Sequence, residues 1–380
     1  MSLRVRCTAL LGLALLAAGP LPAQVPVPSP PALGSRGYIL VDYLSGQVLA
    51  ARNENERLPP ASITKLMTAY VVFNALRAGQ IKLSDQVPVS EKAWRTPGSR
   101  MFIEVNTRVG VEDLLQGMIV QSGNDASVAL AEYVAGTESV FAELMNQHAQ
   151  RLGMLNTHYQ NATGLPAENH YTTAADIARL ARAIVHDFPE YYRWYSQREF
   201  TYNGITQKNR NTLLWRDPSV DGMKTGMTDA AGYCLVSSAE RDGMRLIAVV
   251  LGAKSASARA DDSQALLNYG FRFFETRLMY PAGDAVAETR VWKGDPERTG
   301  LGVHEDVYVT IPRGSYAQVR AELDLPEQLV APISPEQSIG RLRVNLADRT
   351  LAEAQLFALN EVDLGSFWQQ ARDSVLLWFE

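Results

Sequence analysis

The chain has 380 residues, of which 36 are basic and 41 acidic, so its formal net charge is −5. Hydrophobic residues make up 46% and charged residues 20%, which excludes a disordered chain and, at roughly 150 residues per domain, predicts two globular domains. The mild acidity argues against a nucleic-acid partner, which needs a concentrated basic surface. Two cysteines and five histidines without a His-Glu-x-x-His pair exclude a disulfide scaffold and zinc peptidase chemistry, so we expect no metal and no other cofactor.

The first 23 residues have the features of a cleaved export signal. Arg4 and Arg6 precede an apolar run over residues 7–18, and a small-residue cleavage site ends at Ala23. The apolar run is too short to be a good membrane span. Cleavage after Ala23 leaves Cys234 as the one cysteine, and its apolar neighbours predict a buried position in a strand.

The segment that follows predicts a mixed α/β (α+β) domain over residues 24–276. It begins with a proline-rich linker over residues 24–36. Hydrophobic periodicity and turn residues then predict strands at 38–43, 48–51, 233–238 and 245–251, the last two as a hairpin, and helices at 61–79, 111–121, 125–135, 138–152, 173–186 and 260–275.

Residues 277–361 have a different pattern, which predicts a small antiparallel β domain. Apolar and polar residues alternate at 307–311, 319–323 and 342–346, and turn residues separate these segments. The segment contains no cluster of titratable residues that resembles a site. We therefore expect a spacer or an interaction platform rather than a second active site.

The C-terminal segment, residues 362–380, predicts an amphipathic helix. One face would carry aromatic and aliphatic side chains and the other polar ones: Phe367, Trp368, Ala371, Val375, Trp378 and Phe379 against Gln369, Gln370, Asp373 and Glu380. Aromatic residues at a chain end favour a helix that lies in the headgroup region of a membrane. The alternative is a helix packed on the protein or on a partner, because Arg372 is its only cation and anionic lipid would not attract it.

A first motif places a serine and a lysine three residues apart at the start of the predicted helix 61–79. On a helix, Ser62 and Lys65 face the same side and can touch. A serine hydroxyl becomes a good nucleophile when a base takes its proton, and a lysine can be that base if burial or nearby cations lower its pKa. The motif alone is weak, because Ser-x-x-Lys often marks a helix cap with a solvated lysine.

Two further motifs are weak separately but not together. Ser122-Gly123-Asn124 lies in the break between two predicted helices, and Lys224-Thr225-Gly226 lies just before the predicted hairpin. Each one alone is ordinary loop or turn material. Gly226 would let a substrate backbone approach a strand edge closely.

In this order, Ser-x-x-Lys, Ser-x-Asn and Lys-Thr-Gly resemble the motifs of active-site serine penicillin-recognising enzymes. The closer resemblance is to the low-molecular-mass penicillin-binding proteins of the D-alanyl-D-alanine carboxypeptidase family. It rests on residues 60–68, 121–126, 222–226, 269–276 and 307–314 and on the layout of export signal, catalytic domain, small β domain and amphipathic tail. The resemblance covers nearly the whole mature chain. It implies a transpeptidase-like catalytic domain and a location at the periplasmic face of the inner membrane.

The resemblance implies a D,D-carboxypeptidase that acts on peptidoglycan stem peptides ending in D-Ala-D-Ala and is acylated by β-lactam antibiotics. Ser62 would be the nucleophile and Lys65 its base, and Ser122 would pass the proton toward the leaving amine. Lys224 would supply the field that keeps Lys65 neutral enough to act.

The remaining implied roles concern substrate binding. Asn124 would bind the substrate amide, and Thr225 and Arg259 would hold the terminal carboxylate. The oxyanion hole would be the backbone N–H groups of Ser62 and Met227.

This sequence departs from the family pattern at two positions and leaves two alternatives open. Met227 stands where some relatives have histidine, and Thr163 stands where relatives carry histidine in the Asn-x-x-Gly-Leu loop. Both departures concern substrate preference and deacylation rate. The alternatives are a β-lactamase or transpeptidase of the same superfamily, and a non-catalytic wall-binding protein.

Overall fold

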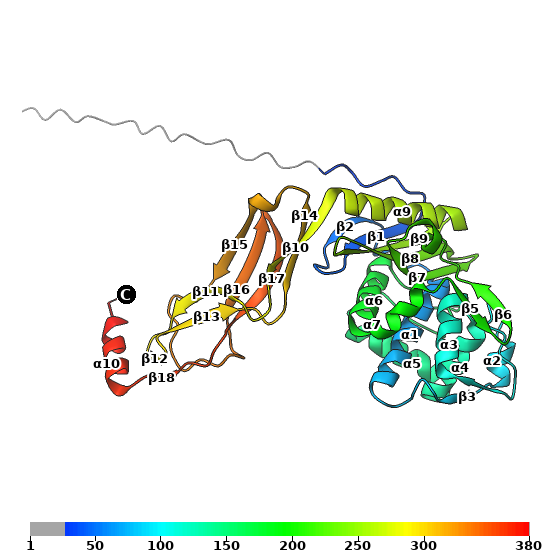
Figure 1. Ribbon diagram of the computed structural model, residues 1–380, viewed down its shortest axis with the longest axis horizontal. Helices are drawn as coiled ribbons and strands as arrows, with labels where there is room; N and C mark the ends of the chain where they lie inside the picture. Colours follow the sequence, from blue (N-terminus) through cyan, green and yellow to red (C-terminus); the bar gives the residue numbers. More distant parts are fainter. Residues whose placement is uncertain (1–26, 380) are drawn as a thin grey trace, which may run out of the picture.

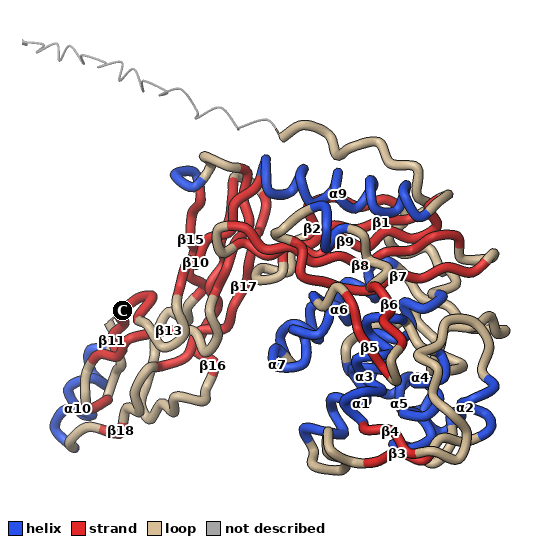
Figure 2. Tube along the Cα trace, turned by 45° about the vertical axis from the view of Figure 1, so that its right-hand side comes forward, coloured by secondary structure: helices blue, strands red, loops and turns tan. Residues whose placement is uncertain are grey.

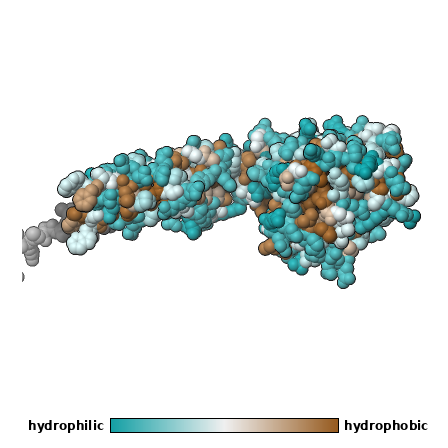
Figure 3. Space-filling model, turned by 90° about the horizontal axis from the view of Figure 1, so that it is seen from below, coloured by the Kyte–Doolittle hydropathy of each residue, from teal (hydrophilic) through white to brown (hydrophobic). Residues whose placement is uncertain are grey.

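A computed structural model describes residues 27–379 and shows two lobes joined by a narrow waist (Figures 1 and 3). The first lobe combines helices with a sheet, and the second consists almost entirely of strands. A final helix lies at the far end of the second lobe. The predicted export signal, residues 1–23, lies outside the described residues.

The first lobe is built on a five-stranded antiparallel sheet in the order β2-β1-β9-β8-β7. Its strands are β1 (Gly37–Asp42), β2 (Val48–Arg52), β7 (Val220–Thr228), β8 (Gly232–Arg241) and β9 (Met244–Ala253). The predicted hairpin is confirmed as β8 and β9, and Cys234 is buried in β8. The segment with Lys-Thr-Gly forms a further strand, β7, at the edge of the sheet.

Helices cover both faces of this sheet (Figure 2). The helices and helical turns are η1 (Ala61–Thr64), α1 (Lys65–Arg77), α2 (Glu91–Arg95), α3 (Val111–Gln116), η2 (Gly117–Gln121), α4 (Asn124–Ala135), α5 (Glu138–Arg151), α6 (Ala174–Asp187), α7 (Pro189–Tyr192), η3 (Arg193–Ser196), α8 (Leu213–Arg216) and α9 (Ala256–Phe273). Helix α9 packs on one face, and α6 packs on the other. Helix α1 is buried continuously from Lys65 to Phe73, as expected of a helix at the centre of a helical layer.

The main differences from the predicted elements have local causes. The predicted helix 61–79 begins as the 3₁₀ turn η1, in which Ala61 has a φ of 47°. The predicted helix 111–121 continues from α3 into a π-helical turn, η2, which ends where Ser122 adopts a left-handed φ of 69°. Helix α9 begins earlier than predicted because the Ser255 hydroxyl caps it by accepting a hydrogen bond from the Ala258 N–H.

Two short two-stranded sheets in this lobe were not predicted. They pair β3 (Gln86–Pro88) with β4 (Arg108–Gly110) and β5 (Glu199–Tyr202) with β6 (Ile205–Lys208). Strands of three or four residues are too short to show a clear alternation in the sequence.

The second lobe has a five-stranded sheet in the order β11-β13-β17-β16-β15 and a ribbon of β10 and β14. Its elements are β10 (Phe274–Tyr280), β11 (Ala285–Arg290), β12 (Gly294–Asp295), β13 (Arg298–Gly302), β14 (Val307–Pro312), η4 (Tyr316–Gln318), β15 (Val319–Asp324), β16 (Ser338–Leu346), β17 (Arg349–Ala358), β18 (Asp363–Leu364) and α10 (Phe367–Leu376). The strands predicted at 307–311, 319–323 and 342–346 are β14, β15 and β16. The predicted boundary at residue 276 falls inside β10.

A buried carboxylate joins the two lobes. Asp42, at the end of β1, accepts hydrogen bonds from the hydroxyls of Ser45 and Thr276, at 2.9 and 2.7 Å. Thr310 of β14 lies 2.7 Å from the Ser45 hydroxyl and 3.0 Å from that of Thr276. These hydroxyls satisfy a carboxylate that would otherwise be costly to bury.

Candidate active site

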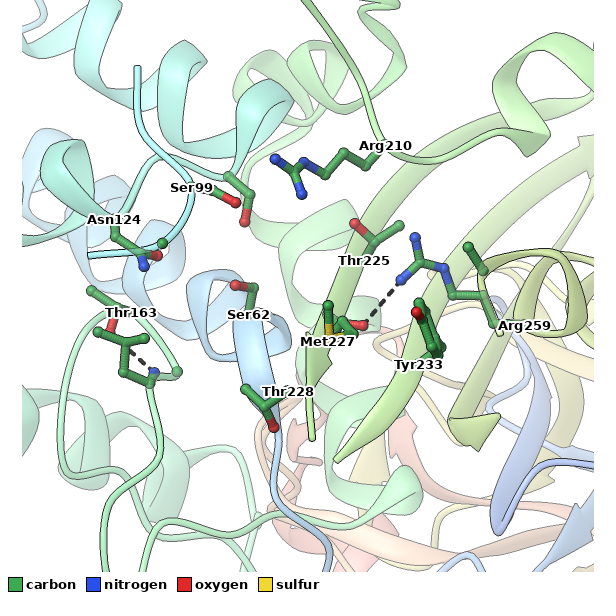
Figure 4. Close-up of a pocket in the computed structure, with 16 residues that line it drawn as sticks. Ser62, Ser99, Asn124, Thr163, Arg210, Thr225, Met227, Thr228, Tyr233 and Arg259 are labelled. Atoms are coloured by element: carbon green, nitrogen blue, oxygen red, sulfur yellow. Dashed lines mark hydrogen bonds between the residues drawn. The ribbon is translucent and has the colours of Figure 1, made fainter. Parts of the chain in front are cut away.

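A cleft of about 680 Å³ lies between the edge strand β7 and the helical layer of the first lobe. Its lining includes eight of the predicted or related site residues, with Ser62 near the centre of the view in Figure 4: Ser62, Ser122, Asn124, Thr163, Thr225, Gly226, Met227 and Arg259. The three motifs, far apart in the sequence, therefore meet at one place.

Ser62 and Lys65 are in contact. Lys65 Nζ lies 3.0 Å from Ser62 Oγ, 2.7 Å from Asn124 Oδ1 and 2.6 Å from the backbone oxygen of Thr163. The last two partners are acceptors only. A neutral amine would donate its two N–H groups to them and direct its lone pair at the Ser62 hydroxyl, the one partner that can donate.

Lys65 is 1% exposed, and burial lowers its pKa to about 7. The carboxylate of Asp125 opposes this shift, and the guanidinium of Arg210 adds to it. At neutral pH a substantial fraction of Lys65 is therefore uncharged. Arg210 is thus a cation that adds to the effect of burial, while the field expected from Lys224 stays a prediction.

Ser122 and Asn124 lie on either side of the break between η2 and α4. Ser122 is buried, has a left-handed backbone conformation and lines the cleft. The Asn124 carboxamide accepts from Lys65 and donates to the backbone oxygen of Pro97, at 2.6 Å. Each end of the carboxamide thus has one partner within the protein, and its Oδ1 helps to orient the amine of Lys65. The side chain also lines the cleft, and its expected contact with a substrate amide stays a prediction.

Strand β7 brings Thr225, Gly226 and Met227 to the cleft edge, and Lys224 precedes them on the strand, outside the cleft lining. Lys224 is buried, and burial lowers its pKa well below the usual range, with further lowering by the charges of Lys65, Arg210 and Arg259. Its Nζ donates to the backbone oxygen of Thr225 at 3.2 Å.

Gly226 has a packing role that the sequence did not predict. A Cβ at this position would lie 3.1 Å from Ala61 Cβ and 3.2 Å from the backbone nitrogen of Ile63. The absent side chain lets β7 pack directly on η1, the turn that carries Ser62. The Lys-Thr-Gly strand and the serine turn are therefore held together at this glycine.

Arg259, on the first turn of α9, lines the cleft and contacts β7. Its Nη1 donates to the backbone oxygens of Gly226 and Cys234, at 3.0 and 3.4 Å, and its guanidinium lies 5.6 Å from the Tyr233 ring centroid. Burial lowers its pKa, although the group remains a cation at any ordinary pH.

Arg210 and Asp125 are site residues that the sequence analysis missed. Arg210 lines the cleft above Thr225 in the view of Figure 4, on the same side as Arg259. Asp125 is buried and accepts hydrogen bonds from the backbone N–H groups of Met101, Phe102 and Ile103, which fixes the loop beside the cleft. In the sequence, Arg210 stands between Asn209 and Asn211, and Asp125 directly follows the second motif. These were the signals from which the two residues could have been found.

His170 is hydrogen-bonded to Thr64, the last residue of the turn η1 that carries Ser62. Asn161 Nδ2 lies 3.3 Å from its Nδ1, so the ring proton is on Nε2 and is donated to Thr64 Oγ1 at 3.0 Å. Burial lowers the pKa of His170 to about 4.

This pKa predicts a loss of stability in mild acid. An unfolded histidine titrates near 6.5, so between about pH 6.5 and 4 the unfolded state binds the proton and the folded state does not. The contribution is complete above pH 6.5 and falls by on the order of 3 kcal/mol as the pH drops to 4. Thermal unfolding midpoints from pH 4 to 8 should show a steeper decline for the wild type than for His170→Asn, and equal slopes would contradict the assignment.

Within residues 27–379, no three His, Cys, Asp or Glu side chains are grouped in a way that suits a metal ion. None of the helices in the same range has the length and hydropathy needed to cross a bilayer.

Comparison with known proteins agrees with this geometry. The sequence pattern of the D-alanyl-D-alanine carboxypeptidase family matches residues 24–255, and that of the penicillin-binding protein 5 C-terminal domain matches residues 274–364. The chain is 45% identical to D-alanyl-D-alanine carboxypeptidase DacC of Escherichia coli, over 92% of this chain and 89% of the relative. It is 42% identical to DacA of the same organism, over 98% and 94%.

A solved structure shows the same arrangement. Penicillin-binding protein 5 from Haemophilus influenzae is 43% identical and superposes with a TM-score of 0.85, covering 88% of this chain and 99% of the other. The expected fold, a penicillin-recognising catalytic domain with a second, all-β domain, is confirmed. The chain belongs to the D-alanyl-D-alanine carboxypeptidase family of serine-type hydrolases, the low-molecular-mass penicillin-binding proteins.

Proposed function

We propose that this protein removes the terminal D-alanine from peptidoglycan stem peptides that end in D-Ala-D-Ala. The observation that carries the assignment of residues is the contact between Ser62 and a buried Lys65 whose other two partners are acceptors. This arrangement makes Lys65 a base aimed at one hydroxyl.

The reaction proceeds in two steps. Ser62 Oγ attacks the peptide carbonyl between the two D-alanines and gives its proton to Lys65. The C–N bond breaks, Ser122 passes the proton to the leaving amine, and D-alanine departs. Water then hydrolyses the Ser62 ester. Backbone N–H groups of Ser62 and Met227 stabilise the oxyanion in both steps.

Cations at the cleft select the substrate. Thr225 and Arg259 hold the terminal carboxylate, and Arg210 adds a second positive charge to the lining of the cleft. An exopeptidase needs such a site, because the free carboxylate distinguishes a chain end from an internal bond. β-Lactams carry a carboxylate next to a reactive amide, and they acylate Ser62 at the same position.

The test is D-alanine release from a peptide ending in D-Ala-D-Ala, compared with the same peptide carrying a C-terminal amide. We expect efficient release only from the free carboxylate. Equal rates on both peptides would contradict the carboxylate site. Rapid turnover of penicillin without a lasting acyl-enzyme would indicate a β-lactamase, and a cross-linked dimeric product would indicate a transpeptidase.

We further propose that the protein is exported with residues 1–23 as signal peptide. Residues 24–276 form the catalytic domain, residues 277–361 the β domain, and residues 362–380 a helix that binds the periplasmic face of the inner membrane. Two features of α10 support the last assignment. Asp373 is buried and accepts from the Lys293 N–H at 2.7 Å, and Gln369 Nε2 donates to the Gly294 oxygen at 2.6 Å.

These polar contacts turn the apolar side chains of the helix outward. Phe367, Trp368, Trp378 and Phe379 are 76, 80, 89 and 81% exposed. Exposed aromatic residues gathered at one chain end suit the bilayer interface.

Deletion of residues 362–380 should therefore release the protein from membranes while peptide hydrolysis continues. Sedimentation with phosphatidylethanolamine–phosphatidylglycerol vesicles measures this, and Trp368→Glu should weaken binding where Gln370→Glu, on the polar face, does not. A truncated protein that still sediments with the vesicles would contradict the anchor.

A further inference from the structure

The side chain of Arg210 reaches the cleft without being held by any contact of its own. Within residues 27–379 its guanidinium makes no hydrogen bond or ion pair, and the residue is exposed and lines the cleft. Figure 4 shows it extending above Thr225 toward Ser99. A long side chain with no partner needs a fixed backbone if its charge is to act at one place.

The residues on either side of Arg210 supply that fixed backbone. Asn211 is fully buried; its Nδ2 donates to the Gly222 oxygen at 2.9 Å, and its Oδ1 accepts from the Leu213 N–H at 3.2 Å. Asn209 is 7% exposed; its Nδ2 donates to the Gln197 oxygen at 3.0 Å.

The two asparagines are also joined to each other. Asn209 Oδ1 accepts from the Asn211 N–H at 2.9 Å, and the Asn209 N–H donates to the Arg198 oxygen at 2.7 Å. The chain is thus tied to β7 on one side and to residues 197–198 on the other. Because both asparagines turn inward, the side chain between them is directed outward, over the cleft.

The anchor on β7 links this loop to the chemistry. Gly222 lies two residues before Lys224 and three before Thr225 on the same strand. A movement of the strand that carries these residues would therefore also move Arg210.

We propose that Asn209 and Asn211 are positioning residues, which hold the Arg210 guanidinium over the cleft by tying its backbone to β7. The proposal rests on the proposed function of Ser62 and Lys65. It implies that loss of either asparagine changes the reactivity of the base, Lys65, and not only the stability of the fold.

The charged groups that face Lys65 come from three elements. Asp125 of α4 raises its pKa, Arg210 lowers it, and Lys224 of β7 is a second buried amine beside it. If Arg210 loses its position, the lowering contribution is lost while that of Asp125 remains. The pKa of Lys65 then rises, and acylation of Ser62 needs a higher pH.

The experiment measures Ser62 acylation by a fluorescent penicillin from pH 5.5 to 9 in the full chain. Asn211→Ala and Arg210→Gln should each move the acid limb up by roughly half a pH unit, which is about threefold in rate on that limb. The double variant should behave as Arg210→Gln alone, because both changes act through one group. Asn209→Ser repeats the test if Asn211→Ala does not fold.

A matched control is Asn146→Ala, because Asn146 also holds a backbone segment through both ends of its carboxamide and lies outside the cleft lining. Asn146 donates to the Tyr159 oxygen at 2.9 Å and accepts from the Tyr159 N–H at 2.8 Å. It should lower the unfolding midpoint without moving the acid limb. An unchanged limb in the folded asparagine variants, or a shift that adds to that of Arg210→Gln, would overturn the proposal. A wild type that penicillin does not acylate would instead refute the proposed function.

Discussion

Ser62→Ala should abolish both covalent labelling by penicillin and release of D-alanine. The substitution removes the one hydroxyl that Lys65 contacts and leaves no atom to form the acyl-enzyme. We expect a loss of at least ~10³-fold in the rate of peptide hydrolysis, the range seen when a nucleophile is removed. Gel fluorescence with a labelled penicillin and a D-alanine assay measure the two effects.

The control for this substitution is a serine that caps a helix away from the cleft. Ser366→Ala removes the cap of α10, in the second lobe, and should weaken that helix while labelling persists. Labelling of Ser62→Ala at high antibiotic concentration would mean that another residue is the nucleophile.

Lys65→Met should also reduce acylation, by about 10²- to 10⁴-fold, because it removes the base and keeps an apolar stem in the buried site. Raising the pH should not restore the rate, since no titrating group replaces the amine. Lys65→Arg should be equally inactive, because a guanidinium does not lose its proton in this range. Stopped acylation reactions at several pH values give the rates.

Lys82→Met is the matched control, because this lysine is exposed and lies outside the cleft lining. Its acylation rate should equal that of the wild type. A Lys65→Met variant that acylates within threefold of the wild type would show that another group takes the serine proton.

The sequence predicted the elements with strong periodicity and the motifs with distinctive spacing. Helices α4 to α6 were found because their apolar residues recur with the period of a helix, and strands β14 to β16 because theirs alternate with the period of a strand. The contact of Ser62 with Lys65 was predicted because three residues make about one turn, and it survives although η1 is a 3₁₀ turn rather than an α-helix.

The missed features depend on contacts between distant segments. Arg210 reaches the cleft only because buried asparagines attach its loop to β7, and no local pattern shows that attachment. The packing role of Gly226 against Ala61 is equally invisible in the sequence, where a glycine after Lys-Thr suggested room for substrate. The burial of Lys65 and Lys224, and the effect of Arg210 on the pKa of both, are likewise visible only in the folded structure.

The pH dependence of penicillin acylation in the wild-type protein tests most directly whether Lys65 activates Ser62. A base with a pKa of about 7 predicts a rate that rises with pH and levels off above neutrality. A rate that is constant from pH 5.5 to 9, or that still rises tenfold per pH unit at pH 9 as for an ordinary lysine, would contradict the account.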